Sequence, residues 1–407
     1  MTRMRAVAGA VRAAVCLCLS VQTARAASPD RQSTAAAVAA SNKFGFELYA
    51  RVKDGGENVI CSPVSASIAL TMAWAGARGA TGREMTRALA LPPTEPAQTH
   101  AAFASLLAAL NARGEKGDVT LQVADRLWAQ EGLSFQPAYL RLLSDRYRAP
   151  LESVDFARAT EQARVTINRW AAVQTHDRIR EVLRPGDLST LTRLVLTNAV
   201  YLKATWAVEF AKGHTVDGPF TSPKGEVVAK MMHKAASFRY ARAQDLQILE
   251  LDYRGGLSMV VVLPDAADGL AAAERRLAGS YQAWLKALDF KLIDLKLPRW
   301  TVTSRLALSK ALSEMGMSTA FSQAADFSGI AKLRPLFIQT VLQQAFVKVD
   351  EVGTEAAAVT VVAEGTASKS GSRERPIAFH ADHPFLYLIR DQSTGVVLFI
   401  GRVVDPR

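Results

Sequence analysis

The feature that most constrains the fold is a continuous apolar run, LTRLVLTNAVYLKATW, over residues 191–206. The run is rich in β-formers and lacks the alternation of apolar and polar residues that marks a strand with one face in water. It therefore predicts a central strand buried on both faces. A chain with such a strand is expected to build a substantial sheet.

Other segments predict a protein of mixed strand and helix. Strands are predicted at 119–130 (VTLQVADRLWAQ) and 257–264 (LSMVVVLP). Residues 385–404, FLYLIRDQSTGVVLFIGRVV, predict a hairpin around DQSTG. Apolar residues on helical spacing predict a helix at 160–183, and another begins near Pro63, a residue that suits a first helical turn.

The first 26 residues are typical of a secretory signal peptide. The arginine-bearing MTRMRAVAGAVR precedes the apolar AAVCLCLSV, and ARA supplies small residues before Ala27. Nine apolar residues are too few to span a bilayer, so no membrane anchor is predicted. We expect a bacterial exported protein, secreted or periplasmic. A flexible lead at 27–40 precedes one domain at 41–407, because no Gly, Ser or Pro-rich linker follows.

Cysteine content and charge exclude several classes. Cys16 and Cys18 leave with the signal peptide, so Cys61 alone remains and no internal disulfide is expected. Removing the four arginines of the signal lowers the formal net charge from +11 to +7. The chain has no run of five basic residues and no aromatic interleaving of the kind that binds nucleic acid. We expect a monomer with no nucleic-acid or membrane partner.

Catalytic and metal-binding motifs are missing from the sequence. It contains no GxSxG, HExxH, GxGxxG or phosphate-loop motif. HADH at 380–383 offers two imidazoles and a carboxylate but lacks a third protein ligand at a known spacing. DEVGTE lacks the oxygen-ligand pattern of a calcium loop. We therefore expect no enzyme activity, no metal and no cofactor.

One stretch, DEVGTEAAAVTVVAEGTASKS at 350–370, fits neither a loop nor an ordinary strand. It follows the strand-like FVKV, and it carries small and β-branched residues where turn residues are usual. It has the composition of a strand without an obvious partner.

Seven segments carry a family resemblance, which spans nearly the whole chain after the signal. They are NVICSPVSASIALTMAWAGARGATGREM, INRWAAVQTHDRIREVL, LVLTNAVYLKATWAVEF, TVDGPF with Met231 and Met232, SMVVVLP, DFSGI and ADHPFLYLIRDQSTGVVLFIGRVVDP. In this order they resemble the serpins, a family of protease inhibitors. The resemblance implies an α+β fold of three β-sheets surrounded by eight or nine helices, with an exposed reactive-centre loop at 351–376.

The unusual stretch is similar to the family's hinge motif, GTEAAAVT. The hinge residues that the resemblance implies are Glu351, Gly353, Thr354, Glu355, Ala356, Ala357, Ala358 and Thr360. In a strand, Thr354, Ala356, Ala358 and Thr360 would share one face, and all are small enough to enter a packed sheet without overpacking. The opposite face, with Glu355, Ala357 and Val359, is expected to tolerate charge.

The resemblance implies a suicide-substrate inhibitor. A target serine or cysteine protease forms an acyl-enzyme with the loop, and the cleaved loop then inserts into the sheet and traps the protease in a covalent 1:1 complex. Insertion of a serpin loop is among the established examples of stored strain. The alternative is a non-inhibitory serpin that acts as a binding or chaperone-like protein. Such a relative would carry a bulky or charged residue on the inward face near Thr354, and this chain carries none on that face.

The family's spacing places the scissile bond between Ala367 and Ser368, seventeen residues through from Glu351. A small apolar residue before the bond predicts an elastase-like or subtilisin-like target. Counting back from HPF instead moves the bond toward Ser370 or Arg373, with Lys369 nearby, and Arg373 would favour trypsin-like enzymes.

Further positions match by motif. Ser62, Ser65 and Asn198 match the family's shutter, a hydrogen-bonded cluster through which the sheet opens, and Trp206 matches the breach, where the loop enters. Gln343 stands where many serpins have a shutter histidine; it cannot become a cation, so no pH gate is expected through it. The serines as a helix cap and Trp206 as an apolar core residue are structural alternatives that are compatible with these roles.

Overall fold

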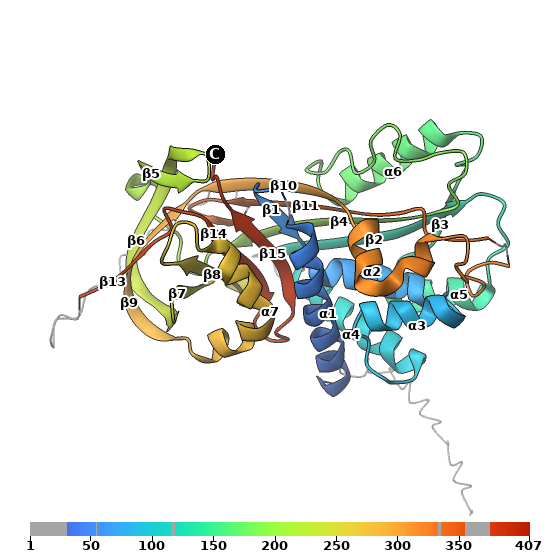
Figure 1. Cartoon of the computed structure of the whole chain (residues 1–407), viewed down its shortest axis with the longest axis horizontal. Coiled ribbons are helices and arrows are strands. Elements are labelled where there is room, and N and C mark those ends of the chain that lie inside the picture. Colours follow the sequence, from blue (N-terminus) through green and yellow to red (C-terminus); the bar gives the residue numbers. More distant parts are fainter. Residues whose placement is uncertain (1–30, 54, 115–118, 333–334, 355–374) are drawn as a thin grey trace, which may run out of the picture.

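A six-stranded sheet of order β10-β11-β12-β4-β2-β3 is the centre of the computed structural model, which describes residues 31–53, 55–114, 119–332, 335–354 and 375–407 (Figure 1). Its strands are β2 (Val119–Gln130), β3 (Glu152–Val154), β4 (Leu194–Thr205), β10 (Trp300–Ala307), β11 (Thr340–Val349) and β12 (Gly353–Thr354). Pairing is antiparallel except between β2 and β3 and between β4 and β11.

Strand β4 confirms the prediction of a central strand buried on both faces. Leu196 and Val200 pack into the core on the side of α1 (Arg31–Val52), α2 (Pro63–Trp74) and α4 (Pro96–Gly114). Val195 and Ala199 pack on the opposite side with residues of α6 (Thr160–Gln174). Figure 1 shows α6 on one side of this sheet and α1 to α5 on the other. Because both faces are covered, the strand has no need of polar alternation.

The second sheet has nine strands, in the order β1-β15-β14-β8-β7-β6-β9-β13 with β5 on β6. The strands are β1 (Val59–Cys61), β5 (Val216–Ser222), β6 (Gly225–Ala243), β7 (Leu246–Asp252), β8 (Leu257–Pro264), β9 (Asp289–Pro298), β13 (Ile377–His380), β14 (Phe385–Asp391) and β15 (Val397–Val403). The α+β architecture is confirmed. The expected three sheets form two hydrogen-bonded sheets within the described chain, because the long β6 pairs with β5, β7 and β9.

The described residues contain eight α-helices. Besides α1, α2, α4 and α6 these are α3 (Gly79–Ala88), α5 (Pro137–Leu142), α7 (Leu270–Lys286) and α8 (Ser309–Leu312). Since α1 begins at Arg31, the predicted flexible lead at 27–40 is wrong from that residue on: Ala37 and Ala40 are buried in the main core. None of the helices described here combines the length and the apolar character needed to cross a bilayer.

The helix predicted at 160–183 is also too long, because α6 ends at Gln174. Thr175 donates its hydroxyl proton to Ala171 O and accepts from Ile179 N, and His176 follows with a φ of 48°. These bonds turn the chain, so Ile179 and Leu183 reach the core from a loop. The other predicted elements are confirmed: β2 and β8 have the predicted bounds, and β14 and β15 form the predicted hairpin.

Candidate functional site

The hinge turn, residues 350–352, reverses the chain at the end of β11 and leads into the two-residue strand β12. Gly353 pairs with Thr205, and Thr354 pairs with both Ala204 and Val349. Strand β12 therefore lies between β4 and β11 and is antiparallel to both. The side chain of Thr354 is fully buried. The chain has thus entered the central sheet by two residues, at one end of the β4–β11 pair.

Gly353 is required by the close approach of β4. A Cβ atom at this position would lie 2.1 Å from Ala204 O, a distance that non-bonded atoms do not reach. The φ of 155° lies in a region that residues with side chains rarely adopt. Glycine therefore lets the backbone enter between the two strands, in agreement with its predicted place in the hinge.

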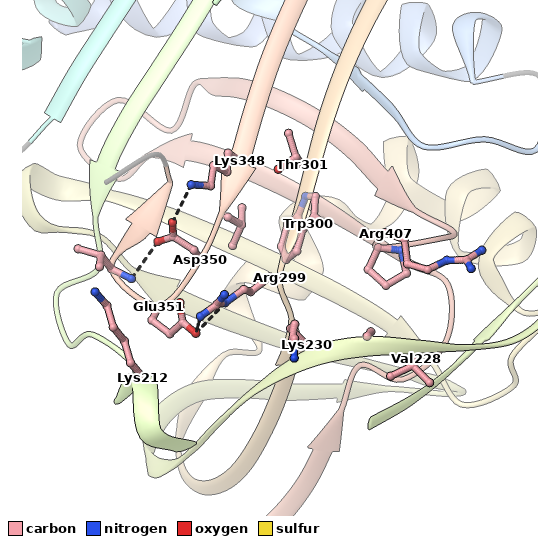
Figure 2. Close-up of a pocket in the computed structure, with 14 residues that line it drawn as sticks. Lys212, Val228, Lys230, Arg299, Trp300, Thr301, Lys348, Asp350, Glu351 and Arg407 are labelled. Atoms are coloured by element: carbon pink, nitrogen blue, oxygen red, sulfur yellow. Dashed lines mark hydrogen bonds and ion pairs between the residues drawn. The ribbon is translucent and has the colours of Figure 1, made fainter. Parts of the chain in front are cut away.

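Glu351 anchors the hinge turn through a buried carboxylate. Its side chain is 3% exposed and accepts hydrogen bonds from Arg299 Nε at 2.7 Å and Thr215 Oγ1 at 2.5 Å. Figure 2 shows the Glu351 carboxylate directed at the Arg299 guanidinium. Burial alone would raise the pKa of Glu351, but the hydrogen bonds from Thr215 and Arg299 outweigh it and lower the pKa below its ordinary value. The turn is therefore held by an ionised carboxylate across a wide pH range.

Trp206 contacts the hinge turn from the end of β4. Its backbone N donates to Val352 O at 2.8 Å and its Nε1 to Asp350 O at 3.0 Å. Its ring stacks on Tyr253 with centroids 4.1 Å apart, and the Tyr253 hydroxyl lies 2.7 Å from Thr354 Oγ1. The structure thus places Trp206 at the entry point of β12, the position that the resemblance implied for the breach.

Beyond β12 the strands β4 and β11 pair directly, and we call this parallel pairing of residues 195–201 with residues 340–346 the seam. Gln343 lies opposite Asn198 near its middle. Gln343 Nε2 donates to Asn198 Oδ1 at 2.7 Å. A side-chain hydrogen bond therefore joins the two strands that a further inserted strand would have to separate.

The four predicted shutter residues lie together around this bond. Ser62 N donates to Gln343 Oε1 at 2.8 Å, and Gln343 Nε2 also donates to Ser62 O at 2.9 Å. Asn198 Nδ2 donates to Ser65 Oγ and to Asp125 Oδ1. The side chain of Ser62 does not cap α2; its hydroxyl donates to Leu398 O at 2.7 Å. The cluster thus ties α2 to β2, β4 and β11.

Asp125 belongs to the cluster and was missed by the sequence analysis. It lies opposite Asn198 on β2, and its carboxylate also accepts a hydrogen bond from Ser65 Oγ at 3.2 Å. Burial raises the pKa of Asp125 to about 7, although the hydrogen bonds from Asn198 and Ser65 act in the opposite direction. No local signal marks this residue, because its partners lie on β4 and α2, more than fifty residues away.

Several predicted site residues lie outside the described residues. These are Glu355, Ala356, Ala357, Ala358, Thr360, Ala367, Ser368, Lys369, Ser370 and Arg373. The neighbouring strands do test one statement about their surroundings, the expected tolerance of charge on the face opposite Thr354. That face of β4 is buried under α6 at Ala199 and half-buried at Lys203. Only its end near the hinge turn accommodates a charge, so the expectation is wrong for the remainder.

The histidines of HADH serve different partners. His383 contacts Asp382 Oδ1 at 2.9 Å and Pro264 O at 2.7 Å, whereas His380 contacts Asp294. Within the described ranges no group of three or more His, Cys, Asp or Glu is placed to hold a metal ion. Burial raises the pKa of Cys61 to about 12, so this thiol stays protonated and unreactive at neutral pH.

Comparisons with known proteins agree with this geometry. The family model described as Serpin (serine protease inhibitor) matches residues 39–406. A serpin-like protein of Thermococcus kodakarensis is 38% identical over 371 residues, covering 91% of this chain and 86% of the relative. The leukocyte elastase inhibitor of Bos taurus is 37% identical over 381 residues, covering 90% and 99%. The crystal structure of Serpin48 from the insect Tenebrio molitor is 30% identical with a TM-score of 0.82, covering 92% and 99%.

Proposed function

Since the chain belongs to the serpin family, we propose that it inhibits a serine or cysteine protease as a suicide substrate. The observation that carries the proposal is β12, which has entered the central sheet between β4 and β11 and pairs with both. The relatives named leukocyte elastase inhibitor support protease inhibition in general. The target class, the covalent complex and the scissile bond belong to the proposal.

The register of β12 supports a prediction of where a longer inserted strand would lie. Thr354 is opposite Ala204 and Val349, so continuing both ladders by six residues brings Thr360 opposite Asn198 on one side and Gln343 on the other. Asn198 and Gln343 already face each other in the seam. The two registers therefore converge on one residue, and the hydroxyl of Thr360 would take the place of the Gln343–Asn198 hydrogen bond.

Neighbouring positions fit the same register. Ala356 would lie opposite Leu202 and Val347, and Ala358 opposite Val200 and Ala345, all of which are buried in the main core. Small side chains are needed there, because overpacking costs about 1–3 kcal/mol per misfit.

Glu355 points to the opposite face in this register. It would lie opposite Lys203 and Lys348, at the end of the seam nearest the hinge turn. An acid between two lysines is favourable there, since directly opposed charges of unlike sign stabilise a sheet.

Insertion of the loop lowers the free energy because of the way the strands of the sheet are paired. The seam is a parallel ladder, which is less stable per residue than an antiparallel one. An inserted strand replaces that single ladder with two antiparallel ladders and gives its own backbone groups partners on both sides. Cleavage of the loop frees one end and allows this rearrangement.

The same register supports Ala367 as the residue before the scissile bond. Thirteen residues beyond Thr354, Ala367 would lie opposite Leu191, which is exposed just before the start of β4. A protease acylated at Ala367 would therefore be carried about 40 Å, to the far end of the sheet. The protease supplies the nucleophile that attacks the Ala367 carbonyl and releases the Ser368 amine, while the chain supplies the displacement.

The proposal places the target outside the cytoplasm. The predicted signal peptide at 1–26 lies outside the described residues, and secretion or export to the periplasm rests on its sequence. Small residues before the bond favour elastase-like and subtilisin-like proteases. The second candidate, a non-inhibitory serpin, would be cleaved in the loop without trapping the protease.

The test is to mix the protein separately with pancreatic elastase, subtilisin and trypsin, and to analyse the products on denaturing gels. We expect a band at the summed mass with elastase or subtilisin, and a released C-terminal peptide that begins at Ser368. Cleavage by all three proteases without that band would establish a substrate and favour the non-inhibitory alternative. A peptide beginning after Arg373 would instead indicate a trypsin-like target.

A further inference from the structure

A cavity of about 510 Å³ lies beside the hinge turn (Figure 2). Cationic side chains reach it from five separate parts of the chain: Lys212, Lys230, Arg299, Lys348 and Arg407. Its volume falls within the range of small-molecule sites, roughly 300–1,000 Å³. Such a cavity admits a compact ligand, and the convergence of cations indicates the sign of its charge.

Positive charge on the lining exceeds the negative charge. The lining side chains are five cations and two acids, Asp350 and Glu351, which leaves a formal excess of three positive charges. The two acids are already paired, Glu351 with Arg299 and Asp350 with Lys348 at 3.3 Å. The cavity is therefore electrostatically suited to an anion.

Of the five lining cations, Lys212 is the one to which the described residues offer no counter-ion. Lys230 pairs with Asp217 at 2.8 Å, and Arg407 pairs with Asp405 at 2.7 Å. Among the described residues, by contrast, nothing forms an ion pair or hydrogen bond with the Lys212 ammonium. In Figure 2 the hinge-turn acids Asp350 and Glu351 lie between Lys212 and the other two labelled cations, Arg299 and Lys348. An anion in the cavity would give Lys212 a partner of opposite charge.

We propose that this cavity binds a small multivalent anion through phosphate or carboxylate oxygens, with Lys212 as its principal contact. Lysine ammonium groups bind such oxygens as point charges. The bound anion would link Lys212, the start of β10 and the end of β11, which together surround the hinge turn.

A consequence follows that rests on the proposed function. In the inserted register Glu355 lies opposite Lys348, so an anion held by Lys348 would compete with Glu355 for the same charge. The ligand would then slow entry of the loop and stabilise the uncleaved form. The cavity would be a regulatory site next to the point of insertion.

The experiment measures binding without a protease, so its outcome is independent of whether the protein inhibits one. Pyrophosphate and, separately, citrate are titrated calorimetrically into the full chain at an ionic strength held constant with NaCl. We expect saturable 1:1 binding and a melting temperature that rises with ligand until saturation. Binding of pyrophosphate alone would support the proposal and assign the ligand to the phosphates, and binding of citrate alone would assign it to the carboxylates.

Matched variants separate a site from general charge effects. Lys212→Ala is expected to weaken binding about tenfold, as loss of one charged hydrogen bond does, and to leave the melting temperature without ligand unchanged. Lys310→Ala removes the same charge from α8, where the side chain is 91% exposed, and is expected to bind like the parent. Multivalent anions also stabilise proteins by exclusion from the surface, but that effect does not saturate. Absence of saturable binding, or equal weakening in both variants, would overturn the proposal.

Discussion

At the scale of single residues, the hydrogen bonds across the seam run in one direction. The Ser62 backbone N–H can only donate, so it fixes the Gln343 amide with Oε1 toward itself. Gln343 Nε2 then donates to Asn198 Oδ1, which leaves Asn198 Nδ2 to donate to Asp125. A carboxylate that only accepts completes this chain, yet burial favours the protonated acid at the same position.

Asp125 therefore makes stability depend on pH. Its pKa is raised to about 7 in the folded protein, so between about pH 4 and 7 the folded state holds a proton that the unfolded state has lost. The stability that this bound proton contributes is fully present below about pH 4 and is lost as the pH rises through about 7. We expect Asp125→Asn to remove this decline, which is on the order of a few kcal/mol at most.

Denaturant midpoints measured from pH 4.5 to 8.5 test this prediction. As the pH rises to about 7, the midpoint of the parent is expected to fall steadily relative to the midpoint of Asp125→Asn. Above about pH 7 the difference between the two midpoints is expected to stay constant. Asp268→Asn, a change at an exposed carboxylate, serves as the control and is expected to follow the parent at every pH. A pH profile for Asp125→Asn that runs parallel to the parent would contradict the assignment.

At the scale of elements, the register of β12 makes Thr360 the residue that must pass between Asn198 and Gln343. We expect Thr360→Arg to stop insertion at the middle of the seam, because its long charged side chain would overpack the space beside the buried Asn198 and Gln343 and would lose its hydration there. The variant would be cleaved but would form less than a tenth of the covalent complex. Densitometry of denaturing gels after reaction with subtilisin or elastase gives the ratio of complex to cleaved protein.

A control for this variant lies in the same segment. Ser372→Arg adds the same charge on the C-terminal side of the proposed bond, in a part that does not insert in the proposed register, and is expected to form complex like the parent. If Thr360→Arg and Ser372→Arg give equal yields of complex, the inserted register proposed for the loop is wrong.

The elements also show what sequence alone predicts. β4 was predicted because burial on both faces leaves a long apolar run, a signal contained within the strand itself. The end of α6 was not, because the apolar spacing continues through Ile179 and Leu183 while the hydroxyl of Thr175 turns the chain. The start of α1 was missed because an alanine-rich segment resembles a flexible lead until the core that buries Ala37 is known.

Some residues of the candidate site were also identified from the sequence, and others only from the structure. Gly353, Glu351 and the shutter residues were identified by resemblance to a family. Asp125, Arg299 and Thr215 were not, since their roles depend on partners far away in the chain. Sequence motifs marked the hinge turn itself, whereas the ion pair that anchors it and the acid that ends the shutter required the packed structure.

At the scale of the whole molecule, the central sheet has room for a further strand between β4 and β11 only if the seam opens. β4 spans twelve residues, and β12 occupies two of the positions opposite it. A cleaved loop could fill the remaining positions with residues 355–364, adding backbone hydrogen bonds to both neighbours and burying valines at 359, 361 and 362. Each valine contributes about 1.5 kcal/mol or more when buried, and each hydrogen bond about 1 kcal/mol.

Cleavage should therefore stabilise this protein, whereas most proteins are weakened by a broken chain. We expect the protein cut between Ala367 and Ser368 to melt at least about 10 °C above the uncut protein, since several kcal/mol are gained against the entropy of ordering the loop. Differential scanning calorimetry of both forms measures this, with Thr360→Arg cut at the same bond as the reference that cannot complete the strand. If the cut parent has the same melting temperature as the uncut protein, the loop stays outside the sheet after cleavage. The trapping mechanism would then have no source of free energy.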